Sequence, residues 1–521
     1  MKKFLSCHAK PVRGVLSGFD RIRFRGTFRQ LAHREGMSSI LSYLKVLLKD
    51  FRVFAEQSTA RLQAGVEAVA LKAGRAVQYL PSPQTNKEEL VQKTLRENGV
   101  GKGGVIAVLS TVELCQSYEI HRNRETKHIE LQPARRKCLH YYVYLQDSMF
   151  GLVHVRMQSW LPFNIHIVVN GREWLARQMD AAGLRYQRAD NCFPWIEHFA
   201  SAQKLADRQL KTDWPKHLER LLHKANPAFC DLLPTVRMEA YWSAEQSEWA
   251  TDVAFASAKD LAALYPRLVQ HAMTSFQSRD VLRFLGYRSF LKGKIHPAFK
   301  GEVVSDVAAR PEGVRIKHRV NGNALKMYDK QGSVLRIETT INDARDLRVF
   351  RRKEGDRKGE RQYRCLRKGV ADLRRRAQLC RSANSRYLDA LAAADSSTPL
   401  KEFTDVLSRP AELNGRRRRA LNPLGSDATL LTVISRAEFL VKGFRNADIR
   451  TALLGPDPQD DLRERRRRSA RVSRLLTLLR AHRLVKKIPH TQRYLLTAFA
   501  QQCLPAILAA REASLQKLTA A

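Results

Sequence analysis

The chain has few acidic residues for its size, no long apolar run and no closely spaced cysteines. Asp and Glu number 51 against 92 Lys and Arg in 521 residues, which leaves a net charge of +41. Repulsion on that scale opposes a compact fold unless a polyanion neutralises it, so an ordinary metabolic enzyme is disfavoured. Nucleic acid is the polyanion that this charge favours, and an acidic membrane surface is the alternative.

The cysteines and the short apolar segments indicate the compartment. No two of the eight cysteines stand at CxxC spacing, so the sequence carries no zinc-ribbon or thioredoxin signal. No uncharged apolar run approaches the roughly 18 residues of a membrane span. The apolar stretch that follows Lys3 stops far short of a signal-peptide core. We therefore expect a cytoplasmic protein with reduced thiols and no membrane partner.

Hydrophobic patterning predicts an α+β protein of several domains. Residues 1–100 are expected to form a mostly helical region, and residues 101–350 an antiparallel α+β body. Residues 351–424 read as a basic helical connector, residues 425–500 as a small separate domain, and residues 501–521 as a C-terminal helix.

Alternating polar and apolar residues predict the strands of the body. A strand near Phe19–Arg25 has one unusually basic face. The other expected strands are Tyr141–Gln146, Leu152–Trp160 and Phe163–Val169 as a meander, Thr235–Trp242 and Trp249–Phe255 as a pair, and Gly313–Val320, Ala324–Tyr328 and Val334–Ile341 as a further group.

The last hundred residues predict three helices followed by a hairpin. The third helix, from about Arg465 to His482, has an apolar stripe of Val472, Leu475, Leu476 and Leu479. Its opposite side carries Arg466, Arg467, Ser469, Arg471, Ser473 and Arg474. Two strands then follow, Leu484–Ile488 and Arg493–Thr497.

This order and spacing resembles a winged-helix DNA-binding domain of the MarR-like type. The resemblance implies that the third helix enters the major groove and that the hairpin touches the adjacent backbone. Carried over by position, the base- or phosphate-facing residues would be Ser469, Arg471, Ser473 and Arg474, and the phosphate-facing residues Lys486, Lys487 and Arg493. Further phosphate contacts are expected from Arg416, Arg417, Arg418, Arg419, Arg466 and Arg467. A protein-docking domain is the alternative interpretation, and the linker at 455–463 is longer and more acidic than in that family.

Carboxylates near the predicted strands raise the possibility of catalysis. Asp20, Asp147, Asp252 and Glu338 lie in or beside strands, where carboxylates can hold two Mg²⁺ or Mn²⁺ ions for phosphoryl transfer. A metal-dependent nuclease or transposase of the ribonuclease-H-like kind would place its acids in this way. The alternative is that Asp147 is a turn residue and Glu338 a cross-strand partner for arginine.

A second pattern suggests a rolling-circle nickase. Asn164-Ile165-His166 resembles the strand that carries metal ligands in such enzymes, which would make His166, with Asp20 and Glu338, a candidate ligand. The segment from Lys326 to Lys330 (KMYDK), followed by LRIE ending at Glu338, resembles part of phage and plasmid replication proteins. Tyr328 would then be the nucleophile of a 5′-phosphotyrosine link. Its alternative role is a half-buried strand aromatic.

Three classes of function therefore stay open. One is a nucleic-acid-binding protein, DNA-binding by preference, whose layout is similar to transposases and replication initiators of mobile elements. Another is a metal-dependent nuclease, transposase or nickase. The third is a structural RNA-binding protein, for which exposed aromatics among Tyr141, Tyr142, Tyr144 and Trp160 would be favourable. We expect these four rings to be core residues instead.

Overall fold

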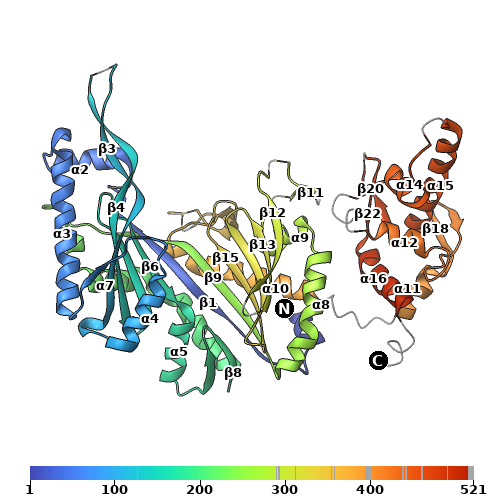
Figure 1. Cartoon of the computed structure of the whole chain (residues 1–521), viewed down its shortest axis with the longest axis horizontal. Coiled ribbons are helices and arrows are strands. Elements are labelled where there is room, and N and C mark those ends of the chain that lie inside the picture. Colours follow the sequence, from blue (N-terminus) through green and yellow to red (C-terminus); the bar gives the residue numbers. More distant parts are fainter. Residues whose placement is uncertain are drawn as a thin grey trace. The chain divides into compact units, whose positions relative to one another are not determined.

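The computed structural model is an α+β protein whose chain divides into two compact units, Met1–Ala394 (unit 1) and Asp395–Ala521 (unit 2) (Figure 1). It describes the chain apart from residues 126, 289, 292–293, 298, 311–312, 354, 357, 393–399, 437–438, 440–442, 459–460, 490 and 514–521. The boundaries expected at residues 100, 350 and 425 do not separate compact units. Among the described residues, no helix has both the length and the apolar character that crossing a membrane demands.

Unit 1 is built on one sheet of 11 strands in the order β12-β13-β14-β15-β9-β1-β6-β5-β4-β3-β2. Neighbouring strands are antiparallel except β2 and β3. The strands are β1 Val12–Thr27, β2 Val77–Tyr79, β3 Val105–Arg122, β4 Ile129–Asp147, β5 Gly151–Gln158, β6 Ile165–Asn170, β9 Tyr241–Phe255, β12 Val303–Arg310, β13 Gly313–Val320, β14 Asn323–Lys330 and β15 Val334–Ile341. The expected meander is β4-β5-β6, and the last expected group is β13-β14-β15.

Strand β1 lies in the middle of this sheet, which explains why residues 1–100 form no separate region. It pairs with β9 along its length and with β6 over Arg21–Gly26. Residues directly opposite each other share a face. Phe19 therefore lies beside Trp249 on an apolar face, and Arg21 lies beside Glu248 on a charged face.

The expected strand pair at 235–255 is wrong, because β9 is one continuous strand. The polar stretch between Trp242 and Trp249 looks like a turn in sequence. In the fold its acids lie opposite the arginines of β1: Glu245 is 2.9 Å from Arg23, and Glu248 is 3.4 Å from Arg21. Charge pairing across the sheet thus keeps a polar segment in the extended conformation.

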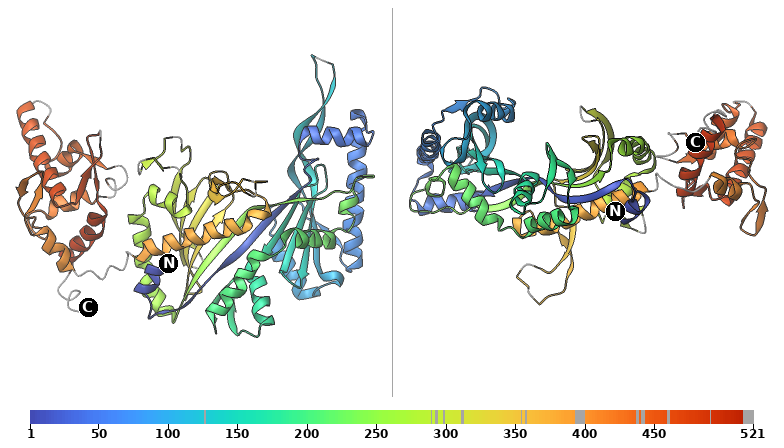
Figure 2. Two further views of the ribbon diagram at one scale, coloured as in Figure 1. Left: turned by 180° about the vertical axis from the view of Figure 1, so that it is seen from behind. Right: turned by 90° about the horizontal axis from the view of Figure 1, so that it is seen from below.

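Helices pack against the apolar face of the sheet. They are α1 Lys2–Cys7, α2 Arg34–Tyr43, α3 Phe51–Lys72, α4 Lys87–Asn98, α5 Gly171–Ala181, α6 Phe199–Arg208, α7 Trp214–Ala225, α8 Ala258–Ser275, α9 Ser278–Leu285 and α10 Leu373–Leu391. Helix α4 is the exception, because its Val91 packs in a separate cluster with Ile106 and Leu109 of β3. Figure 2 shows α10 lying across the strands, where Asn384 bonds to the backbone oxygens of Trp249 and Ile337.

The segment expected to be a helical connector is largely part of unit 1. It begins with a hairpin, β16 Arg348–Arg351 and β17 Gln362–Cys365, that projects away from the sheet (Figure 2). Helix α10 follows and buries Leu388 and Leu391 in the core of unit 1. The basic residues of this tract therefore belong to a hairpin and to the outer side of a packed helix.

Unit 2 contains helices, a two-stranded hairpin of β18 and β19, and a three-stranded sheet in the order β20-β22-β21. Its elements are α11 Leu400–Leu407, the hairpin β18 Ala411–Leu413 and β19 Arg416–Arg418, α12 Ala428–Ile434, β20 Phe444–Arg445, α14 Asn446–Leu454, α15 Leu462–Ala481, β21 Val485–Lys487, β22 Arg493–Leu496 and α16 Ala498–Glu512. Leu407, Leu421 and Leu504 belong to its core. The folding unit is therefore larger than residues 425–500. The end of the expected C-terminal helix, 514–521, lies outside the described residues.

We expect residues 395–521 to fold alone, because unit 2 has a hydrophobic core of its own. Leu476 is 1% exposed in that core, so Leu476→Ala should lower the free energy of unfolding by about 2–5 kcal/mol. Leu462, which is 68% exposed, is the matched control, and Leu462→Ala should change stability by less than about 0.5 kcal/mol. Urea denaturation followed by circular dichroism measures both. Equal stabilities for the two variants would contradict this assignment of the core.

Candidate functional site

A buried group of charges lies where β1, β9, β14 and β15 run side by side. Its centre is Arg336 on β15, which is fully buried. The Arg336 guanidinium donates to both carboxylate oxygens of Asp252, at 2.6 and 2.8 Å, and lies 3.4 Å from Asp20. Arg172 from α5 is 2.9 Å from Asp252 on the other side. Two cations therefore bind one carboxylate and approach a second.

The two aspartates of this group have opposite pKa shifts. Burial raises the pKa of Asp20, although the positive charge of Arg336 opposes the shift. Burial also disfavours the ionised form of Asp252, but Arg172 and Arg336 outweigh burial and the pKa of Asp252 lies below its usual value. Asn191 donates to both oxygens of Asp20, at 3.0 and 2.9 Å. Asp252 is thus the firmly ionised partner, and Asp20 is the carboxyl held nearer to protonation.

Tyr328, Glu338 and Lys326 form the adjoining part of the group. The register of β14 and β15 places Lys326 opposite Glu338 and Tyr328 opposite Arg336. The Tyr328 hydroxyl donates to Glu338 at 2.8 Å, and the Lys326 ammonium donates to the other oxygen at 2.6 Å. We refer to Asp20, Asp252, Tyr328, Arg336 and Glu338 as the Tyr328 cluster.

The pKa shifts in this cluster make Tyr328 the hydrogen-bond donor and Glu338 the acceptor. Burial, with the nearby charge of Glu338, raises the pKa of Tyr328, so the phenol is neutral. Burial alone would raise the pKa of Glu338, but Lys326, the Tyr328 hydrogen bond and Arg336 bring it below its usual value. An ionised carboxylate within hydrogen-bond reach of a hydroxyl has the geometry of a general base beside a nucleophile.

Three of the four acids identified from sequence thus converge, and Tyr328 joins them. The sequence-based prediction did not include the cations that make this convergence possible, Arg336, Lys326 and Arg172. A signal was present in the LRIE segment, because Arg336 and Glu338 are two residues apart and so share a face of a strand. The glutamate of β9, Glu248, was missed as well. It links the cluster to Arg21, whose side chain is 53% exposed.

The expected metal site is not present as a ligand set. Within the described part of the chain, no three His, Cys, Asp or Glu side chains are placed to hold a metal ion. Asp20 and Glu338 face Arg336 and Lys326, while His166 contacts Arg156 at 2.8 Å and Glu245 at 3.3 Å. The arrangement therefore offers Mg²⁺ or Mn²⁺ no shared site at Asp20, Glu338 and His166.

His166 belongs instead to a second polar network on the sheet. Arg156 contacts His166, donates to Glu113 at 2.6 Å and donates to the Tyr142 hydroxyl at 3.0 Å. Tyr142 in turn donates to Glu113. The network borders a cavity of about 480 Å³. The rings at Tyr141, Tyr142, Tyr144 and Trp160 are buried, so they offer no exposed stacking surface.

Asp147, the fourth of these acids, lies apart from the Tyr328 cluster and has partners of its own. It ends β4 and accepts hydrogen bonds from the backbone NH groups of Met149 and Phe150, as a turn residue does. Arg220 and Lys224 of α7 are 2.6 and 3.0 Å from its carboxylate. These contacts anchor α7 to the β4–β5 turn.

Replacing Asp147 with asparagine is expected to destabilise the protein by about 1–3 kcal/mol, since a buried carboxylate with charged partners is lost. Burial would raise the pKa of Asp147, but Arg220 and Lys224 outweigh it and hold the pKa below its usual value. The contribution to stability is therefore present above the unfolded pKa and is lost as the pH falls through the folded pKa. Thermal unfolding from pH 7 to pH 2 should show the two proteins converge in acid. A constant difference would contradict the ion pairing.

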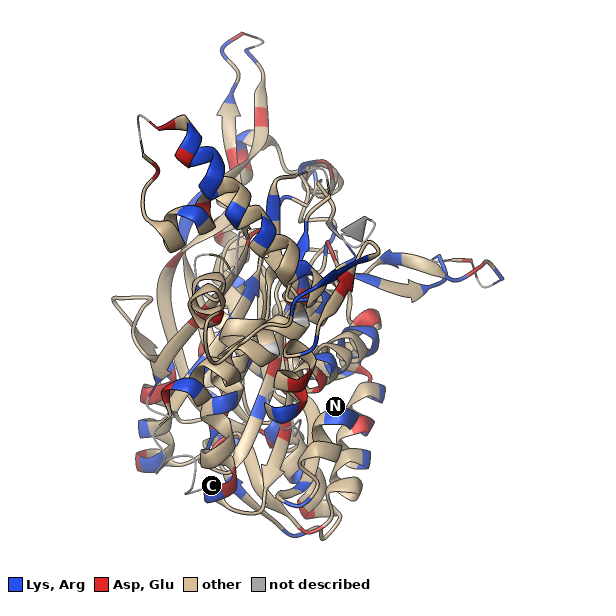
Figure 3. Cartoon of the chain, turned by 90° about the vertical axis from the view of Figure 1, so that its right-hand side faces the viewer, with Lys and Arg blue, Asp and Glu red and all other residues tan. Residues whose placement is uncertain are grey.

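Unit 2 presents the other predicted residues on α15. Arg466, Arg471 and Arg474 are exposed and have no ion pair among the described residues, whereas Arg467 pairs with Glu464. Figure 3 shows the Lys and Arg residues along this helix. Ser469 and Ser473 contact α14. The Asn446 side chain donates to the Ser469 backbone oxygen and to the Ser473 hydroxyl. The serines thus join α15 to α14.

The remaining predicted cations lie on two hairpins of unit 2. Lys486 and Lys487 are exposed on β21, and Arg493 is half-buried on β22. Arg416 and Arg417 are exposed on β19, where they follow a turn rather than a helix. Arg419 is engaged by Asp427 at 2.6 Å.

No protein-family model, curated protein or solved structure matches this chain. Functional conclusions therefore depend on the residues themselves.

Proposed function

We propose that the protein binds DNA and that unit 2 is a winged helix whose third helix, α15, enters the major groove. The order α12, β20, α14, α15, β21, β22 supports this proposal, as does the strand order β20-β22-β21. In such a domain the hairpin β21–β22 is the wing. Lys486 and Lys487 then face the phosphates beside the groove.

The main observation behind the proposal is that α15 has one buried apolar side and one exposed basic side. Val472, Leu476 and Leu479 are buried in the core of unit 2. The exposed arginines Arg466, Arg471 and Arg474 point away from that core and have no acidic partner among the described residues. Unpaired guanidinium groups on one side of a helix suit guanine edges and phosphates, which accept bidentate hydrogen bonds.

The test replaces Arg471 and Arg474 singly with alanine in the full chain. Each variant should keep its fold and lose about 1–3 kcal/mol of duplex-binding free energy, if its arginine makes a bidentate contact. Arg511→Ala is the control, because this exposed arginine lies on α16 and its loss removes the same charge. Gel shifts on a duplex library measure binding. If both variants bind like the control, unit 2 is a protein-docking domain instead.

A second function, DNA-strand cleavage by Tyr328, is favoured by the hydrogen bond from Tyr328 to Glu338. In this step the Tyr328 oxygen attacks a backbone phosphorus, and the bond from phosphorus to the 3′ oxygen breaks. Glu338 takes the phenol proton, and the departing 3′ oxygen takes a proton from water. The products are a 5′-phosphotyrosine link and a free 3′-hydroxyl. Lys326, whose side chain is partly exposed, would offset the negative charge of the phosphate.

The union of a duplex-binding unit with a tyrosine cluster is the layout of replication initiators and transposases, which supports a mobile-element role by analogy. A structural RNA-binding protein is the alternative for the same charge. Measuring duplex DNA and duplex RNA in parallel separates them, because α15 fits the B-form major groove and not the deep, narrow groove of RNA.

A further inference from the structure

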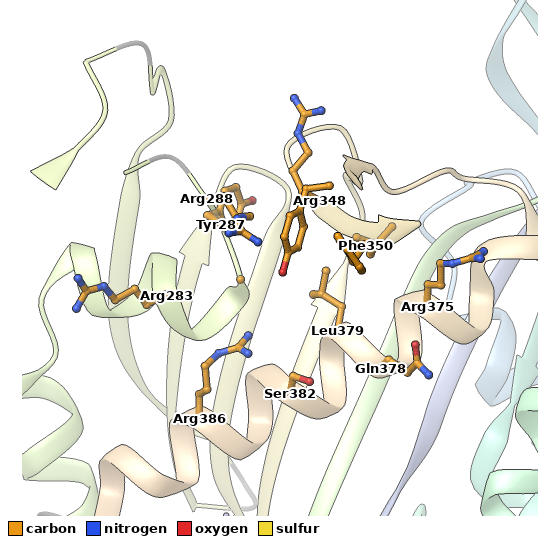
Figure 4. Close-up of a pocket in the computed structure, with 13 residues that line it drawn as sticks. Arg283, Tyr287, Arg288, Arg348, Phe350, Arg375, Gln378, Leu379, Ser382 and Arg386 are labelled. Carbon is orange, nitrogen blue, oxygen red and sulfur yellow. The ribbon is translucent and has the colours of Figure 1, made fainter. Parts of the chain in front are cut away.

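A cavity of about 810 Å³ on unit 1 combines arginines with exposed aromatic rings. Its walls come from the end of α9 and the residues after it, from the hairpin β16–β17, and from one side of α10 (Figure 4). None of the residues that line the cavity belongs to the Tyr328 cluster or to α15. No step proposed above uses its residues.

The charge of this cavity is of one sign. The described residues that line it include no Asp or Glu, and its arginines are Arg283, Arg288, Arg348, Arg375 and Arg386. Arg386 is held in place, because it donates twice to the backbone oxygen of Phe284, at 3.2 and 2.7 Å. Arg375 is 2.6 Å from Asp372, so its charge is shared with that carboxylate. Fixed guanidinium groups lose little entropy on binding an anion, which favours phosphate recognition.

Two of the aromatic rings that line the cavity, Phe350 and Tyr363, are exposed, whereas the third, Tyr287, is buried. Phe350 on β16 is 57% exposed and Tyr363 on β17 is 53% exposed, with their ring centroids 5.1 Å apart. The Arg288 guanidinium lies 3.5 Å from the centroid of the Tyr363 ring and so covers one face of that ring. Exposed rings add nothing to the core, but they offer stacking faces for an unpaired base.

The helical wall adds polar groups in a regular row. Arg375, Gln378, Leu379, Ser382 and Arg386 recur at helical spacing and so lie along one side of α10, as Figure 4 shows. Gln378 and Ser382 are exposed. Between two terminal arginines they provide hydrogen-bonding groups that can reach a base edge or a sugar.

We propose that this cavity binds unpaired nucleotides of a single-stranded nucleic acid. Phe350 and Tyr363 stack on the bases, and the arginines contact the phosphates that flank them. A duplex does not fit this role, because its bases are stacked on each other and present no free face. The site goes beyond the duplex binding proposed for unit 2 and depends on different residues. An acidic peptide would satisfy the arginines but would not need the rings.

The test measures fluorescence anisotropy of the full chain with a labelled ten-nucleotide thymidine oligomer, its uridine counterpart and a labelled duplex. Phe350→Ala and Tyr363→Ala should each weaken binding of the single strands by about 5- to 100-fold, the loss per stacked base. Duplex affinity should change less than twofold. Tyr43→Ala is the control, because Tyr43 is 67% exposed on α2. Circular dichroism checks the folds.

The two oligomers distinguish the source of the strand, since tighter binding of the thymidine oligomer identifies DNA and tighter binding of the uridine oligomer identifies RNA. The proposal is overturned if Phe350→Ala and Tyr363→Ala bind single strands as tightly as Tyr43→Ala does. It is also overturned if a glutamate-rich peptide displaces the oligomer while both ring substitutions leave oligomer affinity unchanged.

Discussion

Replacement of Tyr328 with phenylalanine is expected to abolish any covalent adduct between the protein and DNA, because it removes the only oxygen that could form the link at that position. The substitution keeps the ring and deletes one hydrogen bond, to Glu338, so the fold should persist. Supercoiled and single-stranded DNA are incubated with the protein, with and without Mg²⁺ or Mn²⁺. Denaturing gel electrophoresis then reveals a labelled strand that migrates with the protein.

Tyr142→Phe is the matched control for this experiment. Tyr142 is, like Tyr328, a strand tyrosine that donates to a glutamate, here Glu113, on the same sheet. It should form the adduct like the parent protein. Loss of the adduct in Tyr142→Phe alone would identify Tyr142, not Tyr328, as the nucleophile. If the parent protein forms no adduct, the protein binds DNA without cleaving it through a tyrosine.

Replacement of Arg336 with methionine should cost about 3–5 kcal/mol of stability, because a buried carboxylate loses the partner that offsets its desolvation. Asp252 would keep only Arg172, and Asp20 would keep only Asn191. The exposed pair of Arg345 and Asp343 provides the control. Arg345→Met should change stability by no more than about 1 kcal/mol.

The pH dependence of this effect follows from Asp252. Its folded-state pKa lies below the usual value, so its ion pairs stabilise the protein above the unfolded pKa, near 4. That contribution disappears as the pH falls through the folded pKa. The difference between parent and Arg336→Met should therefore shrink in acid, as urea denaturation at several pH values would show. A difference below about 1 kcal/mol at neutral pH would mean that Arg336 does not hold the cluster together.

Sequence periodicity predicted most strands of the sheet, because alternation reports directly which side of a strand is buried. It failed at β9, where the polar residues between Trp242 and Trp249 face the arginines of β1. Their partners are more than 200 positions away in the chain. No local pattern could reveal that a distant strand would neutralise them.

The candidate site could be predicted only in part, because its residues also come from strands that are distant in sequence. Residue type alone identified Asp20, Asp252, Glu338 and Tyr328, but it identified Asp147 equally well. Only the strand order separates these acids, since β1, β9, β14 and β15 lie next to one another while Asp147 ends β4. The predicted range 425–500 is shorter than unit 2, because Leu407 and Leu504, which complete the core, lie outside the segment that resembles a winged helix.

The most direct test of the central proposal is the salt dependence of duplex DNA binding by the full chain. Each phosphate contact contributes about −0.9 to the slope of log affinity against log salt. The contacts proposed for α15 and the wing therefore predict a slope of about −3 or steeper, and Arg466→Ala, which removes an expected phosphate contact, should make it shallower by about 1. A slope shallower than about −3, unchanged in Arg466→Ala, would contradict duplex binding through α15.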